Sequence, residues 1–393
     1  MNICLVSQEY PPETAFGGIG TYTYHLAQGL AEAGHKVHVI CEGVALRGEY
    51  QDGRVSVHRI FHTHLSASRI LFNEFGLGLE YSWAVFQAIK KVVNDYDIEI
   101  VEGPNAFAEC LIYSFFRRTP LVTRIHTPSS KHMQITQRKI NLDLNLRFCL
   151  ESVMIMQSNL VTSSSHANAR MIMPEVGIPP EKTTIIPLGI NLPKVNSAIT
   201  VKRNGPFSVL FVGRLERRKG FHVLMKAIPT ILREMPEVNF IIVGRDTSDG
   251  PDRQSFKKYV LQDFPEQYNE NVQFPGYVSE EELSVYYKNC DLFIAPSLYE
   301  SFGLIYVEAM AYGKPVIGCR VGGVPEVVKD GETGILVPPE DPAELARAIT
   351  EILINYPLRE KMSQAARTHV EENFSRQKMV ENTLAAYRGL LGK

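Results

Sequence analysis

The sequence lacks the paired cysteines that would indicate a zinc site or a disulfide framework. It has six cysteines, which lie far apart without any C-x-x-C pair: Cys4, Cys41, Cys110, Cys149, Cys290 and Cys319. Such scattered thiols are typical of proteins in a reducing compartment.

Long hydrophobic runs are missing as well. The most apolar long stretch, residues 70–89, is interrupted by Asn73, Glu74, Glu80 and Gln87, and it falls short of the ~20 apolar residues that a membrane-spanning helix needs. The N-terminus leads directly into a strand pattern, without the basic segment and apolar core of a signal peptide. We therefore expect a cytoplasmic protein.

No charge of one sign dominates the chain. The formal net charge is −2, with 41 basic and 43 acidic side chains. We therefore expect no nucleic-acid partner, and any anion that the protein binds has to be held by local groups. Because 393 residues exceed what one hydrophobic core usually supports, two α/β domains are expected.

The first half of the chain opens with a strand, a glycine-rich turn and a helix. Residues 3–6 predict a buried parallel strand, residues 17–20 (Gly-Gly-Ile-Gly) a tight turn, and residues 21–33 a helix closed by Gly34. Further apolar runs at 36–41, 99–101 and 121–125 alternate with helical segments. This alternation is typical of a doubly wound parallel sheet.

The same alternation of strands and helices repeats after a stretch rich in proline and polar residues between Pro187 and Pro206. Residues 208–212 predict a strand and residues 220–234 a helix, and apolar runs at 240–244, 292–295, 315–318 and 334–337 continue the series. We interpret residues 1–195 and 196–375 as two Rossmann-like α/β domains that face each other across a cleft. A last helix over residues 376–391 is a candidate to pack back on the first domain.

The strongest functional motif spans residues 296–313. Ser301 is expected to cap a helix that ends before Gly313, with Glu300 just outside it and Glu308 two turns inside. Two carboxylates so placed are able to accept hydrogen bonds from sugar and ribose hydroxyls. The free amides at the start of such a helix favour a phosphate group. These amides belong to Phe302, Gly303 and Leu304.

This motif resembles the E-x7-E signature of family 4 of the retaining glycosyltransferases, which have the two-domain GT-B fold. The resemblance covers nearly the whole chain, and residues 213–220, 274–278, 313–317 and 322–326 also contribute to it. It implies an enzyme that transfers a sugar from a UDP- or GDP-sugar to a sugar, lipid or small-molecule acceptor, with retention of configuration. The sequence identifies neither the acceptor nor an oligomeric state.

The resemblance implies that Arg214 and Lys219 hold the donor diphosphate. Two fixed cations in a closed site are able to stabilise the departing nucleoside diphosphate without a metal. Their neighbours Arg217 and Arg218 are interpreted as a solvated basic turn.

The remaining donor contacts are likewise implied by the resemblance. Glu308 is expected to bind the ribose and Glu300 the transferred sugar. Tyr277 and Val278 are expected to lie against the base, where backbone contacts leave uracil and guanine undistinguished.

Two features of the first domain match the family. Gly17 and Gly18, after Pro11-Pro12, resemble its N-terminal phosphate loop, because small residues let backbone amides approach a diphosphate. His126 follows a strand and matches the histidine that lies near the anomeric carbon, although a lone histidine in such a place is about as often structural. Its implied role is to position and polarise rather than to act as nucleophile.

Neither a metal nor a cofactor is expected. Asp95-Tyr96-Asp97 has the D-x-D spacing of metal-dependent glycosyltransferases, but it precedes a strand, at the end of a sheet where ligands do not bind. We interpret it as a solvated loop.

Two basic clusters in the first domain are candidates to contact an anionic acceptor or a membrane surface. The alternative is an ordinary amphipathic helix with its charged face in water. The first cluster lies within residues 59–75 and the second within residues 131–147. Their basic members are Arg59, His62, His64 and Arg69, and Lys131, His132, Arg138, Lys139 and Arg147.

Two other kinds of protein share these sequence features. A sugar-nucleotide epimerase or a phosphorylase has the same two-domain architecture, and a non-catalytic nucleotide-binding protein shares its glycine loops. The spacing at Gly17 and Gly18 is not G-x-G-x-x-G, which counts against a dinucleotide-dependent dehydrogenase.

Overall fold

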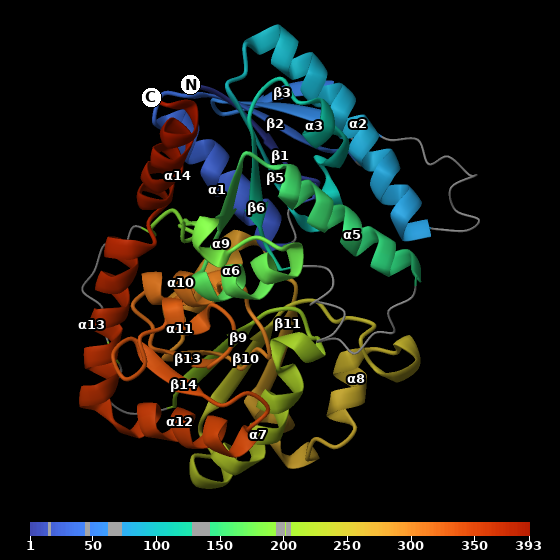
Figure 1. Cartoon of the computed structure of the whole chain (residues 1–393). Coiled ribbons are helices and arrows are strands. Elements are labelled where there is room, and N and C mark those ends of the chain that lie inside the picture. Colours follow the sequence, from blue (N-terminus) through green and yellow to red (C-terminus); the bar gives the residue numbers. More distant parts are fainter. Residues whose placement is uncertain (15–16, 44–47, 62–72, 128–141, 194–200, 202–205) are drawn as a thin grey trace. The chain divides into compact units, whose positions relative to one another are not determined.

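A computed structural model describes residues 1–14, 17–43, 48–61, 73–127, 142–193, 201 and 206–393. The chain forms two compact units (Figure 1). One comprises Met1–Asn191 and Arg376–Lys393, and the other comprises Leu192–Ser375. Both are Rossmann-like, so the predicted fold class of two doubly wound α/β domains is confirmed.

The first unit is built on an eight-stranded sheet in the order β3-β4-β2-β1-β5-β6-β7-β8. Its strands are β1 (Asn2–Val6), β2 (Lys36–Glu42), β3 (Gly48–Asp52), β4 (Val55–Ile60), β5 (Ile100–Pro104), β6 (Leu121–Ile125), β7 (Leu160–Ser163) and β8 (Thr184–Ile185). Among the described strands of this sheet, β3 alone runs antiparallel to its neighbour. The helices are α1 (Gly18–Glu32), α2 (Asn73–Tyr96), α3 (Leu111–Phe116), α5 (Leu142–Gln157), α6 (His166–Ile172) and α14 (Arg376–Leu391).

The two faces of this sheet are covered by different helices. Cys4 and Val6 of β1 pack in one buried cluster with Val85 and Ile89 of α2. Because side chains alternate along a strand, the opposite face carries Leu5 and the residues in register with it. Glu102 of β5 is one of these, since it pairs with Leu5.

The last helix belongs to the first unit, and it packs on α1 (Figure 1). Arg376 donates two hydrogen bonds to the Glu32 carboxylate, at 2.8 and 2.7 Å. Deeper inside, the carboxylate of Glu102 accepts hydrogen bonds from the hydroxyls of Tyr387 (2.8 Å) and Tyr22 (2.6 Å). A buried carboxylate thus ties the C-terminal helix to the centre of the first sheet.

Tyr387→Phe is expected to lower the free energy of unfolding by about 1 to 3 kcal/mol, because it leaves the buried Glu102 carboxylate with one donor fewer. Tyr356→Phe is the matched control. The Tyr356 hydroxyl donates to Glu360 at 3.0 Å on a partly exposed helix, so we expect less than about 1 kcal/mol there. Urea denaturation of both variants checks this, and equal losses would contradict the special role of Glu102.

The second unit contains a six-stranded parallel sheet in the order β11-β10-β9-β12-β13-β14. Its strands are β9 (Ser208–Val212), β10 (Asn239–Val243), β11 (Val272–Gly276), β12 (Leu292–Ala295), β13 (Val316–Cys319) and β14 (Gly334–Val337). Its helices are α7 (Phe221–Glu234), α8 (Phe256–Leu261), α9 (Glu280–Asn289), α10 (Leu304–Ala311), α11 (Val324–Val327), α12 (Pro342–Ile354) and α13 (Tyr356–Asn373).

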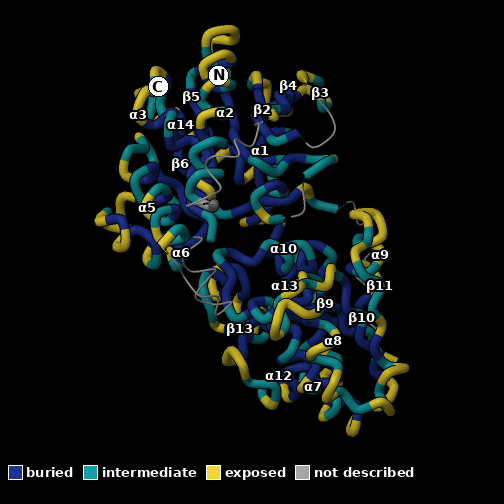
Figure 2. Tube along the Cα trace, turned by 90° about the vertical axis from the view of Figure 1, so that its right-hand side faces the viewer, coloured by how far each residue is buried: buried dark blue, intermediate teal, exposed yellow. Residues whose placement is uncertain are grey.

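The core of this unit lies between the sheet and the helices α7 and α12. One face of α7 is apolar, and its Leu224, Ile228, Ile231 and Leu232 are all buried in one cluster with the strands. Figure 2 shows the central strands β9 and β10 as buried. These strands therefore form a rigid base for the loops at their carboxyl ends.

The strand order reverses once in each sheet. In the second unit the chain runs from β9 through β10 to β11 and then returns to β12, on the other side of β9. In the first unit the corresponding pair is β1 and β5. Ligands of doubly wound sheets bind outside the carboxyl ends of the strands at such a reversal.

The structure corrects one prediction about the first helix. Gly18, Ile19 and Gly20 lie in the first turn of α1, not in a separate turn before it. The helix therefore begins three residues earlier than predicted.

In the described part of the chain, no helix combines the length and the apolar character needed to cross a membrane.

Candidate functional site

The loop after β9 brings two of the predicted cationic residues to the strand reversal. Residues Arg217–Lys219 form a 3-10 turn that ends at Gly220, whose φ of 72° lies in the left-handed region. The Lys219 side chain is directed inward and is only 15% exposed. Arg214 is more open, with a side chain 51% exposed and 3.2 Å from the carboxylate of Glu216.

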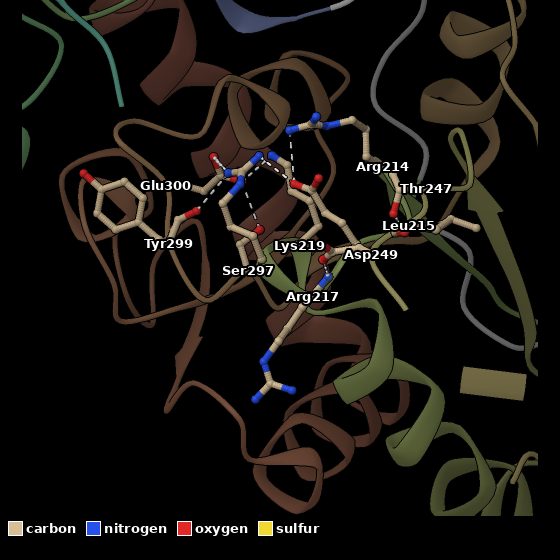
Figure 3. Close-up of polar contacts among 11 residues, drawn as sticks. Arg214, Leu215, Arg217, Lys219, Thr247, Asp249, Ser297, Tyr299 and Glu300 are labelled. Carbon is tan, nitrogen blue, oxygen red and sulfur yellow. Dashed lines mark hydrogen bonds and ion pairs between the residues drawn. The ribbon is translucent and has the colours of Figure 1, made fainter. Parts of the chain in front are cut away.

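The loop after β12 supplies the partner of Lys219. Its ammonium lies 2.5 Å from Oε1 of Glu300, which also accepts a hydrogen bond from the Ser297 hydroxyl at 2.9 Å. Figure 3 shows Lys219 and Ser297 directed toward Glu300. The strand reversal between β9 and β12 therefore carries a buried ion pair.

Charge and burial have opposite effects on the pKa values of this ion pair. Burial alone would raise the pKa of Glu300, but Lys219 and Arg218 together lower it below its usual value. Burial also lowers the pKa of Lys219, although Glu300 opposes this effect. Glu300 is therefore ionised at neutral pH.

Arg218 is a site residue that the sequence analysis placed wrongly in a solvated turn. Its side chain is 9% exposed, and its guanidinium lies 2.9 Å from Glu216 and 3.6 Å from Glu300. It also donates to the backbone carbonyl of Tyr299 at 3.2 Å. Arg218 thus links the loops after β9 and β12. Arg217, in contrast, extends away from the cluster (Figure 3) and pairs with Glu340.

The helix that follows Glu300 begins differently from the prediction. Ser301 does not cap it: α10 starts at Leu304, and the residue before it, Gly303, has a left-handed φ of 97° without a side-chain cap. Phe302 is buried against Phe374, with ring centroids 5.6 Å apart. The leading amides of the helix therefore start at Gly303, one residue later than expected.

Glu308 lies on α10, one turn from its start rather than two. Its carboxylate accepts a hydrogen bond from the Tyr287 hydroxyl at 2.8 Å. Burial raises the pKa of Glu308 to about 7, while Tyr287 and the more distant Lys219 lower it. The two glutamates of the motif thus differ, since Glu300 is fixed as an anion and Glu308 titrates near neutrality.

Tyr277 and Val278 follow β11, at the edge of the same sheet. The Tyr277 ring is 57% exposed, and the guanidinium carbon of Arg245 lies 4.4 Å from its centroid. This exposed, cation-bearing ring is a surface on which a planar group is able to stack.

In the first unit, His126 lies directly after β6. Its backbone amide donates to Oδ1 of the buried Asn105 at 2.7 Å, and its ring meets the Tyr22 ring edge to face at 5.5 Å. Burial and the nearby Arg124 lower the pKa of His126 to about 3. The imidazole is therefore neutral at physiological pH.

The start of α1 carries a carboxylate where the sequence predicts a phosphate. Oε2 of Glu9 accepts a hydrogen bond from the Gly20 amide at 3.3 Å. A Cβ on Gly17 would lie 2.8 Å from the same oxygen, so a larger residue there would require the Glu9 side chain to shift. A phosphate at Gly17 and Gly18 would have to displace this carboxylate, and that role stays a prediction.

Comparison with known proteins shows to which family the chain belongs. The family described as Glycosyltransferase Family 4 matches residues 16–194, and the one described as Glycosyl transferases group 1 matches residues 194–369. The chain belongs to glycosyltransferase family 4. It is therefore a glycosyltransferase.

Individual relatives of this glycosyltransferase match it over nearly their whole length. It is 29% identical to a glycogen synthase of Mycobacterium tuberculosis, over 99% of this chain and 96% of that protein. A solved sucrose-phosphate synthase from Thermosynechococcus elongatus has a TM-score of 0.79 at 24% identity, covering 100% of this chain and 99% of that one. The HepE protein of Anabaena, solved with UDP-glucose, has a TM-score of 0.69 at 20% identity, covering 98% and 100%. These structures confirm the GT-B fold.

Most of the two basic clusters proposed for the acceptor falls outside the described residues of this glycosyltransferase. Of their basic members, the structure describes Arg59 and Arg147. Arg59 is buried and donates to the backbone carbonyls of Glu42, Tyr10 and Pro11. Arg147 is also buried, and its guanidinium lies 4.2 Å from the centroid of Phe107. These two arginines therefore support the local fold.

The D-x-D sequence precedes a strand, as expected, but most of it ends a helix rather than forming the predicted loop. Asp95 and Tyr96 end α2, and Asp97 precedes β5 at its amino end. Over the residues whose positions are described, no group of three or more His, Cys, Asp or Glu side chains is arranged to hold a metal ion.

Proposed function

We propose that this glycosyltransferase transfers a sugar from a nucleoside diphosphate sugar, with retention of configuration and without a metal. The observation that carries the proposal is the buried Lys219–Glu300 pair at the strand reversal of the second unit, beside the more exposed Arg214. A departing nucleoside diphosphate accumulates negative charge, and cations already fixed in place stabilise it without reorganising.

Lys219 has bonding capacity left for a diphosphate. An ammonium has three N–H donors, and Glu300 takes one of them. The leading amides of α10 point in the direction that favours an anion. Lys219, Arg214 and these amides are therefore assigned to the diphosphate.

Glu300 is assigned to two tasks. Its carboxylate already accepts from Lys219 and Ser297 and lies close to Arg218, so it holds Lys219 in position. A carboxylate has about four acceptor sites, which leaves capacity for one hydroxyl of the transferred sugar.

The other donor contacts are the ones that the family implies. Glu308 is assigned to the ribose and the exposed Tyr277 with Val278 to the base. His126 is assigned to the reacting sugar, as a neutral group that positions and polarises. The complex of the Anabaena protein with UDP-glucose supports a nucleotide-sugar donor.

Donor affinity is expected to rise with pH, because ribose hydroxyls donate to the ionised form of Glu308. With a pKa of about 7, the ionised fraction rises from about one tenth at pH 6 to about nine tenths at pH 8. UDP or GDP binding should therefore strengthen by up to about tenfold over this range. Calorimetric titration of wild type and Glu308→Gln checks this. The Glu308→Gln variant shows how much of the pH dependence comes from titration of the nucleotide itself. If nucleotide binding to this variant depended on pH as strongly as binding to the wild type, Glu308 would not be part of the donor site.

The proposed function is tested by following the reaction of UDP-, GDP- and ADP-glucose with a set of sugar, lipid and small-molecule acceptors by proton NMR, in the presence of a chelator. We expect release of a nucleoside diphosphate and a product whose anomeric configuration equals that of the donor. An inverted product would exclude the retaining mechanism. Turnover of the donor to another sugar nucleotide without any acceptor would indicate an epimerase, and binding without turnover would indicate a non-catalytic protein.

A further inference from the structure

The carboxylate of Glu308 has one oxygen engaged and one left for a ligand. Its Oε2 accepts a hydrogen bond from the Tyr287 hydroxyl at 2.8 Å, and within the residues whose positions are described nothing donates to Oε1. Glu308 is only half-buried, in contrast to Tyr287, which is 3% exposed. A ligand therefore reaches the carboxylate at Oε1, while Oε2 is held from inside the protein.

The Tyr287 hydroxyl is fixed in place by packing. Its ring lies near the end of α9, stacked on Tyr312 with centroids 5.9 Å apart and 5.7 Å from the ring of Phe293 in β12. A close-packed ring of this kind has little freedom to rotate, so its hydroxyl oxygen keeps one position. Burial and the nearby Glu308 raise the pKa of Tyr287 well above its usual value. The hydroxyl therefore keeps its hydrogen and stays a donor.

Helix α9 connects this hydroxyl to the loop assigned to the base. Its N-cap, Ser279, lies two residues after Tyr277 and forms a capping box with Glu282. The Ser279 hydroxyl accepts from the Glu282 amide at 3.2 Å, and the Glu282 carboxylate accepts from the Ser279 amide at 2.9 Å. Tyr287 lies two turns further along the same helix. One short helix therefore carries a base contact at its start and the partner of Glu308 near its end.

Other groups around Glu308 act on its charge. Burial raises its pKa to about 7, the Tyr287 hydrogen bond lowers it, Glu280 in the first turn of α9 raises it, and Lys219 lowers it. Burial also raises the pKa of the neighbouring Tyr312, which therefore adds no charge. Tyr287 acts through a hydrogen bond, whereas Glu280 and Lys219 act through charge. Because a hydrogen bond to the ionised form favours that form, the hydroxyl keeps part of Glu308 ionised at neutral pH.

We propose that Tyr287 is a positioning residue for the ribose of the donor. It holds Oε2 of Glu308, so that Oε1 accepts from a ribose hydroxyl, and it favours the ionised carboxylate, which is the stronger acceptor. This inference rests on the proposed function, in which Glu308 binds the ribose. It adds that a buried residue outside the E-x7-E motif sets how tightly the ribose is held.

The effect on Glu308 is measured first without nucleotide, in the full-length protein labelled with ¹³C at the glutamate carboxyls. Glu308→Gln identifies the signal. We expect the pKa of Glu308 to be about 7 in the wild type. In Tyr287→Phe we expect this pKa to be higher by about 1, because the hydrogen bond to the ionised form is lost.

Tyr113→Phe is the matched control. Tyr113 is also 3% exposed, and its hydroxyl donates to the backbone carbonyl of Thr119 at 2.9 Å in the first unit. The control therefore loses a comparable buried hydrogen bond, and its loss of stability should be similar. The titration of Glu308 should not change in it.

The ribose contact is measured by calorimetric titration at pH 7 with UDP, GDP and ADP and with their 2′,3′-dideoxy forms. We expect the wild type to bind one of the three nucleotides about tenfold more tightly than its dideoxy form, as for a hydrogen bond to a carboxylate. Tyr287→Phe should lower this ribose preference by about threefold or more, without changing the affinity for the dideoxy form. Raising the pH to 9 should restore part of the preference, because it ionises Glu308. Tyr113→Phe should keep the full preference.

An unchanged ribose preference in a folded Tyr287→Phe, or an equal loss in Tyr113→Phe, would overturn the inference. A crystal structure of the wild type with the nucleotide decides the matter even if Tyr287→Phe does not fold. A ribose on Oε1, with Tyr287 still on Oε2, supports the inference, and a ribose on Oε2 in place of the Tyr287 hydroxyl contradicts it.

The inference and the proposed function fail in different ways. A protein that loses its ribose preference in Tyr287→Phe but transfers no sugar would leave the inference standing and reject the proposed function. A protein that transfers sugar with an unchanged ribose preference in Tyr287→Phe would do the reverse. Binding of none of the three nucleotides would reject both.

Discussion

Replacing Lys219 by alanine is expected to lower kcat by about two to three orders of magnitude. The ammonium is the least exposed cation assigned to the diphosphate, and loss of one fixed charge-stabilising donor in an enclosed site typically has an effect of this size. The change also leaves Glu300 without its partner at 2.5 Å. Since a buried carboxylate that loses its cation is costly, we expect a loss of about 3 kcal/mol in the free energy of unfolding. Steady-state kinetics and urea denaturation measure the two effects separately.

Arg217→Ala is the matched control for this substitution. Arg217 belongs to the same 3-10 turn, but its side chain pairs with the exposed Glu340 and extends away from the cluster. An exposed ion pair contributes little, so kcat should stay within about twofold and stability within about 1 kcal/mol. Full turnover in Lys219→Ala, or equal losses in both variants, would contradict the assignment of Lys219.

Gly220→Ala is expected to have the largest effect on folding. The φ of Gly220 is 72°, and a Cβ there would lie 1.8 Å from the backbone oxygen of Pro296. The strained backbone and the clash together are expected to cost about 3 to 5 kcal/mol. Because this contact brings the loops after β9 and β12 together, the variant should also lose the Lys219–Glu300 pair. Thermal unfolding and kcat both report this.

Gly331→Ala separates the effect of backbone strain from the effect of the clash. Gly331 has a similar φ of 76°, but a Cβ there meets no atom within 4 Å. Only the backbone strain remains, and we expect a loss of about 1 to 2 kcal/mol with normal turnover. If Gly220→Ala proved no worse than Gly331→Ala, the close packing of the two loops would not hold the site together.

The central strands of both sheets were predictable because parallel strands are buried on both faces and give short apolar runs, whereas the strands β3, β4, β7, β8 and β11 were not predicted. The helix Arg376–Leu391 begins and ends at the predicted residues. The hydrophobic pattern and the turn residues indicate where a strand or helix begins and ends. They do not indicate the order of the strands in each sheet, which places the loops after β9 and β12 side by side.

The site was less predictable, and the errors have physical reasons. Arg218 was interpreted as solvated because three consecutive basic residues look alike in sequence, yet a 3-10 turn directs its members to different sides. Only the buried Glu216 and Glu300 show which of them faces inward. Ser301 looked like a helix cap, but the left-handed Gly303 moves the start of α10 past it.

Some of the chemistry depends on burial that no motif reveals. Glu300 and Glu308 are equivalent in the E-x7-E pattern. Their pKa values diverge because Glu300 lies beside Lys219 and Arg218, while the nearest partner of Glu308 is the neutral Tyr287 hydroxyl. The carboxylate of Glu9 at the start of α1 was likewise invisible in the glycine loop, because the fold alone brings it there.

The central claim is that fixed protein cations in the second unit, rather than a metal, hold the donor's diphosphate. Calorimetric titration with UDP, GDP and ADP, each with a chelator and again with magnesium, tests it most directly. The account predicts that one of these nucleotides binds equally well in both conditions, that Lys219→Ala weakens this binding at least tenfold, and that Arg217→Ala does not. Binding that requires magnesium, or that is unchanged in Lys219→Ala, would contradict it.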